Sequence, residues 1–139
     1  KTIRVTRSVL KEALEQDMTY FTLAPDGSLR VSERFLTPIV QHFNYDYYAN
    51  LSITADIAKK PGERVVSIVY KGQELPEDLT LTLCLNNYRA SGAGGYGCYK
   101  ACPLLAENPT EISELIMQYV EQHREITVDK TKWLHLLHA

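Results

Sequence analysis

Leucine recurs at every second position between Leu79 and Leu85, and threonine or cysteine fills the positions between. This alternation is typical of a β-strand that buries one face, because successive side chains point to opposite sides of the strand. The pattern therefore predicts a strand over residues 79–85. Cys84 is part of it, and we expect its thiol to be buried and chemically inert.

The predicted strand runs directly into a glycine-rich loop with the sequence Asn-Asn-Tyr-Arg-Ala-Ser-Gly-Ala-Gly-Gly-Tyr. Its glycines, Gly92, Gly94 and Gly95, indicate positive φ angles or a close backbone approach to a bound group. The pair Tyr88 and Arg89 offers a flat apolar face beside a positive charge. Such a loop can stack a planar base while backbone N–H groups meet anionic or hydroxyl oxygens. A tight turn with half-buried core tyrosines explains the same residues equally well.

A dinucleotide-binding loop is another interpretation, because residues 92–97 read Gly-x-Gly-x-x-Gly after a strand, with Glu111 about twenty residues further on. In that motif the last glycine opens a helix. Here Pro103 follows soon afterwards, and no helix is predicted before about Pro109. The spacing therefore excludes this interpretation.

Short apolar runs separated by turn residues make up the first half of the chain. We expect strands at residues 2–5 and 53–57, and a central strand at 65–70. Between the first two we expect a helix that starts at Thr6 or Ser8 and ends near Met18, with Glu15 on its exposed side. Residues 32–51 give no clear pattern.

Turn signals connect these elements. Asp26-Gly27 between two apolar runs predicts a hairpin, Pro61-Gly62 predicts a type II turn, and Lys71-Gly72 predicts a further turn. Strands in hairpin order with few helices predict the α+β class, with a mixed or antiparallel sheet and two main helices.

The second main helix is expected after the glycine loop. Asn108 is its predicted N-cap, with Pro109 at the first helical position and Glu111 at the third. Apolar residues then follow at helical spacing to an end near His123, at Ile112, Leu115, Ile116, Tyr119 and Val120. Residues 126–128 are predicted to form the last strand, and residues 133–137 a terminal apolar patch.

Length and charge narrow the class of protein. The 139 residues predict a single domain, and the net charge of −2 argues against a binder of polymeric nucleic acid. No apolar run approaches the ~20 residues of a membrane span. The chain opens at Lys1 with a strand pattern and no methionine, so we expect residues 1–139 to be one domain truncated at its N-terminus.

No metal or catalytic motif is present in the sequence. Cys98 and Cys102 could pair in an exported protein, or remain free thiols, and no further ligands at suitable spacing support a metal site there. The four histidines are scattered, and no Asp-x-His or Gly-Asn-His-Asp/Glu pattern occurs. We therefore expect no catalytic residue, metal or cofactor in this chain.

The loop residues 86–96, together with Pro61-Gly62-Glu63-Arg64-Val65 and Tyr70-Lys71-Gly72, resemble the C-terminal domain of the 5′-nucleotidase family. They are most similar to the bifunctional 2′,3′-cyclic-nucleotide 2′-phosphodiesterase/3′-nucleotidase branch. The resemblance implies a domain that sets substrate specificity by holding the nucleobase between two aromatic rings. One ring falls on Tyr88, and the second would precede Lys1.

The resemblance also implies roles for the residues around Tyr88. Arg89 and Asn87 would make polar contacts with the nucleotide or brace the loop, and Gly92, Gly94 and Gly95 would shape it. Many family members carry Asp where Gly94 stands, and a glycine in place of Ala93. Arg89 directly after the ring favours 2′,3′-cyclic or 3′-phosphorylated substrates.

In the family, catalysis belongs to an N-terminal metallophosphoesterase domain in cis, which carries a pair of divalent metal ions such as Zn²⁺ or Mn²⁺. Family members work outside the cytoplasm, so the resemblance implies an extracellular, periplasmic or cell-wall location. The alternative interpretation is a non-catalytic interaction module that uses an exposed cluster of Tyr45, Tyr47 and Tyr48.

Overall fold

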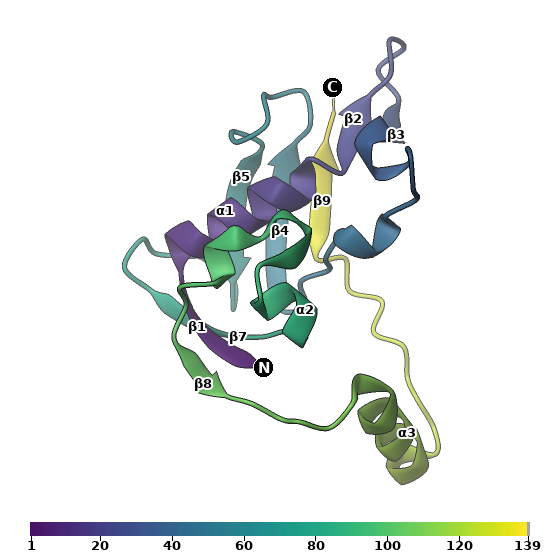
Figure 1. Ribbon diagram of the computed structural model, residues 1–139. Helices are drawn as coiled ribbons and strands as arrows, with labels where there is room; N and C mark the ends of the chain where they lie inside the picture. Colours follow the sequence, from purple (N-terminus) through teal and green to yellow (C-terminus); the bar gives the residue numbers. More distant parts are fainter. Residues whose placement is uncertain (139) are drawn as a thin grey trace.

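The computed structural model describes residues 1–138 (Figure 1). Its larger sheet has the order β6-β5-β4-β9. The central strands β4 (Leu51–Asp56) and β5 (Val65–Tyr70) are antiparallel, β6 (Gln73–Glu74) extends the sheet beside β5, and β9 (Leu134–Leu137) runs parallel to β4. Gly62 has φ +91°, and Glu63 N–H donates to the carbonyl of Lys60, which confirms the predicted type II turn between β4 and β5.

A smaller sheet has the order β7-β1-β8. In it β1 (Thr2–Thr6) pairs antiparallel with β7 (Thr80–Cys84) and with β8 (Leu104–Ala106). The predicted hairpin is present as β2 (Phe21–Leu23) and β3 (Leu29–Val31). The 32–51 segment contains two short 3₁₀ turns, η1 (Glu33–Phe35) and η2 (His42–Asn44).

Helix α1 (Arg7–Met18) joins the two parts of the core (Figure 1). Thr6, one of the two predicted candidates, caps it by accepting a hydrogen bond from Val9 N–H. One side of α1 packs with the larger sheet through Leu10, Leu14, Met18, Ile53 and Ile68. The other side packs with β1 and the segment after the glycine loop through Ala13, Ile3, Val5, Tyr96 and Tyr99. The predicted α+β class is therefore confirmed.

Glu15 differs from the prediction, because it is buried rather than exposed. Its carboxylate accepts hydrogen bonds from the backbone N–H groups of Gly62, Arg64 and Val65, at 2.7–3.1 Å. The Arg64 side chain in turn donates to the carbonyls of Met18 and Phe21. The turn that opens β5 is therefore clamped to the C-terminal half of α1, which satisfies the buried charges.

Three further predictions, all for the second half of the chain, were wrong. α3 (Ile112–His123) starts with Glu111 at the N-cap, while Asn108 accepts from Thr110 N–H in a preceding turn. Residues 126–128 form no strand, and residues 134–137 form β9 instead. Cys84 is exposed, because its side chain lies on the face of β7 opposite to Leu81 and Leu83.

Candidate nucleotide-binding site

The first part of the glycine loop folds into a short helix, α2 (Asn87–Ala90), which the sequence did not predict. Asn86 caps it by accepting from Arg89 N–H at 2.7 Å, and the Asn87 side chain accepts from Tyr88 N–H at 2.9 Å. Because α2 turns neighbouring side chains in different directions, Arg89 is only 3% exposed whereas Tyr88 is 45% exposed.

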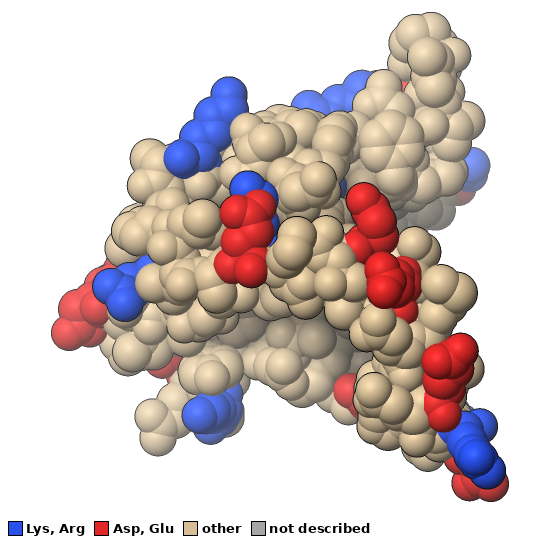
Figure 2. Space-filling model, turned by 60° about the horizontal axis from the view of Figure 1, so that its bottom comes forward, with Lys and Arg blue, Asp and Glu red and all other residues tan. Residues whose placement is uncertain are grey.

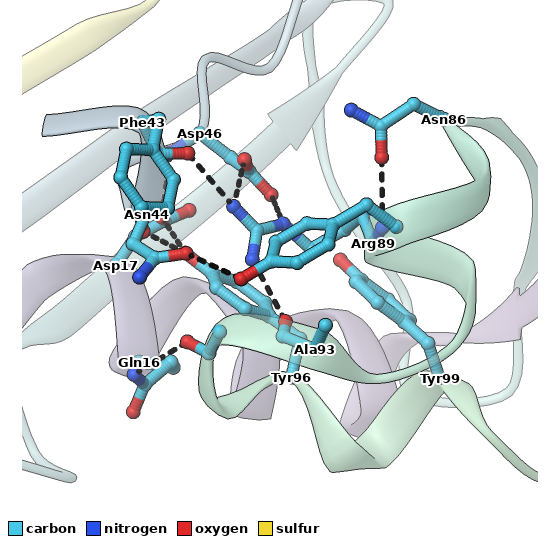
Figure 3. A network of polar contacts seen from close by, with 12 residues as sticks. Gln16, Asp17, Phe43, Asn44, Asp46, Asn86, Arg89, Ala93, Tyr96 and Tyr99 are labelled. Carbon is cyan, nitrogen blue, oxygen red and sulfur yellow. Dashed lines mark hydrogen bonds and ion pairs between the residues drawn. The ribbon is translucent and has the colours of Figure 1, made fainter. Parts of the chain in front are cut away.

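The guanidinium of Arg89 has a partner on every side (Figure 3). Its Nε lies 2.5 Å from Oδ2 of Asp46, its Nη2 donates to the other oxygen of Asp46 at 2.6 Å, and its Nη1 donates to the carbonyl of Ala93 at 2.9 Å. Its flat face lies 3.8 Å from the centroid of the Tyr96 ring. Arg89 therefore joins α2 to the glycines after it and to the segment that follows η2.

Below this cation lies a buried carboxylate, Asp17 of α1. It accepts hydrogen bonds from the Tyr96 hydroxyl and, at 2.9 Å, from Asp46 N–H, while its second oxygen has no partner. Burial raises the pKa of Asp17 to about 7, although these hydrogen bonds favour its charged form. The same burial raises the pKa of Tyr96, so its hydroxyl stays a hydrogen-bond donor.

Two of the predicted glycines have a positive φ and approach other side chains closely. Gly94 has φ +71°, and a Cβ there would lie 2.4 Å from Nη1 of Arg89 and from Oδ1 of Asn44. Gly95 has φ +94°, and a Cβ there would lie 2.5 Å from the Gln16 side chain. A side chain at position 94 would need a positive φ and a shift of the Arg89 and Asn44 side chains, so glycine suits this position.

Tyr88 lies at the surface of this network. Its hydroxyl donates to Oδ1 of Asn44 at 3.3 Å. Phe43, which precedes Asn44 in the chain, is 65% exposed. A cavity of about 440 Å³ reaches Arg89 from the side of β7, and a second of about 920 Å³ lies between β7 and the ends of β4 and β5. Tyr88 lines neither of these two cavities, and its side chain is 45% exposed.

Three residues of this network were not predicted from the sequence, because they come from segments far from the loop: Asp17, Asn44 and Asp46. One signal was available for Asp17: it follows Leu10, Ala13 and Leu14 on the apolar side of α1 at helical spacing. A lone carboxylate on a buried helix face needs a polar partner, and here that partner is the loop.

The tyrosines at 45, 47 and 48 do not form the exposed cluster that the alternative interpretation requires. Tyr48 is buried, and its hydroxyl is 2.9 Å from that of Tyr99. Tyr45 stacks on Tyr20, and only Tyr47 is mostly exposed. The cluster was therefore predicted wrongly.

The thiols of Cys84, Cys98 and Cys102 are free, and Cys102 donates weakly to the carbonyl of Cys98. Within residues 1–138, no three His, Cys, Asp or Glu side chains are grouped so that they could hold a metal ion. None of the helices in this range has the length and apolar character needed to cross a membrane. On the face drawn in Figure 2, charged side chains stand singly or in small groups.

The fold and the loop together define an α+β domain of the nucleotidase class. The chain belongs to the 5′-nucleotidase family: the family described as 5′-nucleotidase, C-terminal domain, matches residues 1–101. The resemblance of the glycine loop is thereby confirmed.

Solved structures of nucleotidases share the fold. A Staphylococcus aureus protein assigned as a 5′-nucleotidase is 31% identical and superposes with a TM-score of 0.91 over 99% of this chain. A 5′-nucleotidase precursor from Thermus thermophilus, 18% identical, gives 0.70 over 99% of this chain. The NAD nucleotidase of Haemophilus influenzae, 17% identical, gives 0.62 over 98% of it. This chain spans 27%, 25% and 23% of those proteins, respectively.

A curated relative points to the same chemistry. The trifunctional nucleotide phosphoesterase protein YfkN of Bacillus subtilis is 20% identical over 136 residues, which cover 89% of this chain and 9% of YfkN. The relatives are nucleotidases and phosphoesterases, so the family is one of hydrolases.

Proposed function

We propose that this chain is the nucleobase-binding specificity domain of a bifunctional 2′,3′-cyclic-nucleotide 2′-phosphodiesterase and 3′- or 5′-nucleotidase, with Tyr88 as the ring on which the base stacks. The observation that carries the proposal is the contrast between Tyr88 and its neighbours. Arg89, Tyr96 and Tyr99 are buried, yet α2 holds the Tyr88 ring open to solvent. A rigid exposed aromatic ring is a stacking surface for a base, worth ~1–3 kcal/mol.

The other loop residues support Tyr88 in this proposal. Arg89 is engaged by Asp46 and Ala93, so its role is to brace α2, while Asn87 holds the backbone of Tyr88. Gly92, Gly94 and Gly95 allow the loop to close on Arg89 and Gln16. The nucleotide then meets the Tyr88 ring and the neighbouring backbone.

Catalysis in this proposal belongs to another part of a longer chain. The described residues provide no site for a pair of divalent metal ions, so the hydrolytic step is assigned to an N-terminal metallophosphoesterase domain in cis. This chain alone is then inactive. With the family's expected place outside the cytoplasm, the whole enzyme is an exported nucleotidase that degrades nucleotides.

The test is substitution of Tyr88 in the whole nucleotidase. Tyr88→Ala should lower kcat/KM for a nucleoside-bearing substrate about five- to a hundredfold, and should affect an aryl phosphate, which has no base, much less. Tyr88→Phe keeps the ring and should stay near wild type. Tyr47→Ala removes another exposed tyrosine as a control. Equal losses on both substrates, or no loss on either, would show that Tyr88 is not a base-stacking residue.

A further inference from the structure

Helix α3 is held away from the rest of the domain on an arm, residues 107–132 (Figure 1). The arm is tied to the body at its two ends. Lys1 Nζ lies 3.0 Å from Oε1 of Glu107, and the Tyr47 hydroxyl donates to the carbonyl of Thr131 at 3.2 Å. Within residues 1–138, no residue of α3 is buried, and no hydrogen bond or ion pair joins α3 to anything outside the arm.

One side of this isolated helix is built to be covered. Apolar and aromatic side chains recur at positions i, i+3, i+4 and i+7, and we call them the α3 stripe: Ile112, Leu115, Ile116, Tyr119 and His123. The His123 ring stacks on Tyr119 with centroids 4.0 Å apart, which extends the stripe. The opposite side carries Glu114 and Glu121. Twelve residues are too few for a stable helix in water without tertiary packing.

The comparison with the Staphylococcus aureus relative bears on whether the body of this domain could cover the stripe. Residues 107–132 are nearly a fifth of this chain, so a TM-score of 0.91 over 99% of it requires the arm to have nearly the same placement in both proteins. In that relative the matched part is only 27% of the chain. The arm therefore keeps its distance from the body in a protein that has a large amount of additional chain to contact.

We propose that the α3 stripe packs against residues of a longer nucleotidase chain that lie outside residues 1–139. Helix α3 then forms an intramolecular contact between this domain and the rest of the enzyme. This rests on the proposed function in taking the chain as one part of a nucleotidase. Ile126 and Val128 are exposed beyond α3 and extend the contact along the arm. The covering surface is apolar, because the stripe carries no acidic or basic group other than His123.

Photo-crosslinking in the whole protein tests which surface covers the stripe. Benzoylphenylalanine replaces Tyr119, which is on the stripe, and in a control replaces Glu121, which is on the opposite side. The expected result is a crosslink within one chain from position 119 to a peptide outside residues 1–139. A crosslink to a second copy, a crosslink to the body of this domain, or a yield no higher than at position 121 would each overturn the proposal.

A matched pair of substitutions provides a second measurement. Ile116 and Met117 are both 58% exposed in this domain, but only Ile116 is on the stripe. In the whole protein, Ile116→Gln places an amide in an apolar contact and should speed hydrogen exchange of α3 about tenfold or more. Met117→Gln should leave exchange unchanged, and equal effects would overturn the proposal. Neither readout involves nucleotide, so failure of Tyr88 as a stacking ring leaves this test intact.

Discussion

The guanidinium of Arg89 lies 3.8 Å from the centroid of the Tyr96 ring, inside the domain rather than at its surface. Asp46 neutralises this cation, and the Tyr96 hydroxyl donates to Asp17 beyond it. The charge that the sequence places next to Tyr88 is therefore used to hold the loop together. Tyr88 remains as the exposed side chain of this pair.

Removing the buried guanidinium of Arg89 should destabilise the protein. Arg89→Ala leaves Asp46 and the Ala93 carbonyl without their donor, and should lower the free energy of unfolding by about 2–4 kcal/mol, with the partial exposure of Asp46 limiting the loss. Arg89→Lys should recover only part of this lost stability, because an ammonium cannot bond to both carboxylate oxygens and stack on Tyr96.

Urea unfolding measures the stability of both variants. Arg30→Ala, at an exposed arginine, should change stability by no more than about 0.5 kcal/mol. Equal effects at positions 30 and 89 would contradict the role of Arg89.

Two glycines that follow Arg89, Gly94 and Gly97, should respond differently to the same change. Gly94→Ala introduces a Cβ at a positive φ and 2.4 Å from Arg89 Nη1, and should cost about 2 kcal/mol or more. Gly97→Ala meets nothing within 4 Å, and should be neutral or slightly stabilising. Thermal unfolding of both variants decides the matter. A well-tolerated alanine at 94 would mean that the loop can open without cost.

The buried carboxylate of Asp17 predicts a pH dependence of stability. Its pKa is raised in the folded protein from 3.8 to about 7, so between these values the folded state keeps a proton that the unfolded chain has released. Raising the pH through this range therefore lowers the free energy of unfolding. Asp17→Asn keeps an oxygen that can accept from Tyr96 and Asp46, and has no charge to bury.

The measurement is urea unfolding of wild type and Asp17→Asn from pH 5 to pH 8. The stability of the variant relative to wild type should increase across this range, by as much as a few kcal/mol. Identical pH profiles would mean that Asp17 is ionised throughout and that Arg89 compensates for its burial.

The three thiols should differ in reactivity. Cys84 is exposed, whereas burial raises the pKa of Cys98 to about 11, which leaves little thiolate at pH 8. Iodoacetamide should therefore label Cys84 first, about tenfold faster than Cys98. Peptide mass mapping of unreduced protein gives the order, and Cys84→Ser should remove the fast phase. If Cys98 and Cys102 react only after reduction, they form a disulfide in the protein, and the prediction of a slowly reacting free thiol at Cys98 is wrong.

Local patterns were sufficient for much of the fold. The alternation of Leu81 and Leu83 with threonines predicted β7, and Pro61-Gly62 predicted the turn between β4 and β5. Thr6, one of two candidate caps, predicted the start of α1. Each of these depends on backbone sterics and on neighbours a few positions away, which a sequence shows directly. The family resemblance of the glycine loop depends on the same kind of local information.

The tertiary structure decided which of two similar apolar segments forms the strand beside β4. It also decided which charged side chains are buried. Residues 126–128 and 134–137 are both short apolar runs, but only the second reaches the free edge of β4, where Ile53 N–H donates to the carbonyl of Trp133. The helical period of α3 was correctly predicted, yet the period does not say what covers its stripe. Glu15 and Asp17 became buried because α1 lies between two segments that bring N–H and hydroxyl donors from positions far along the chain. Such partners are set by long-range packing, so a sequence pattern cannot place them.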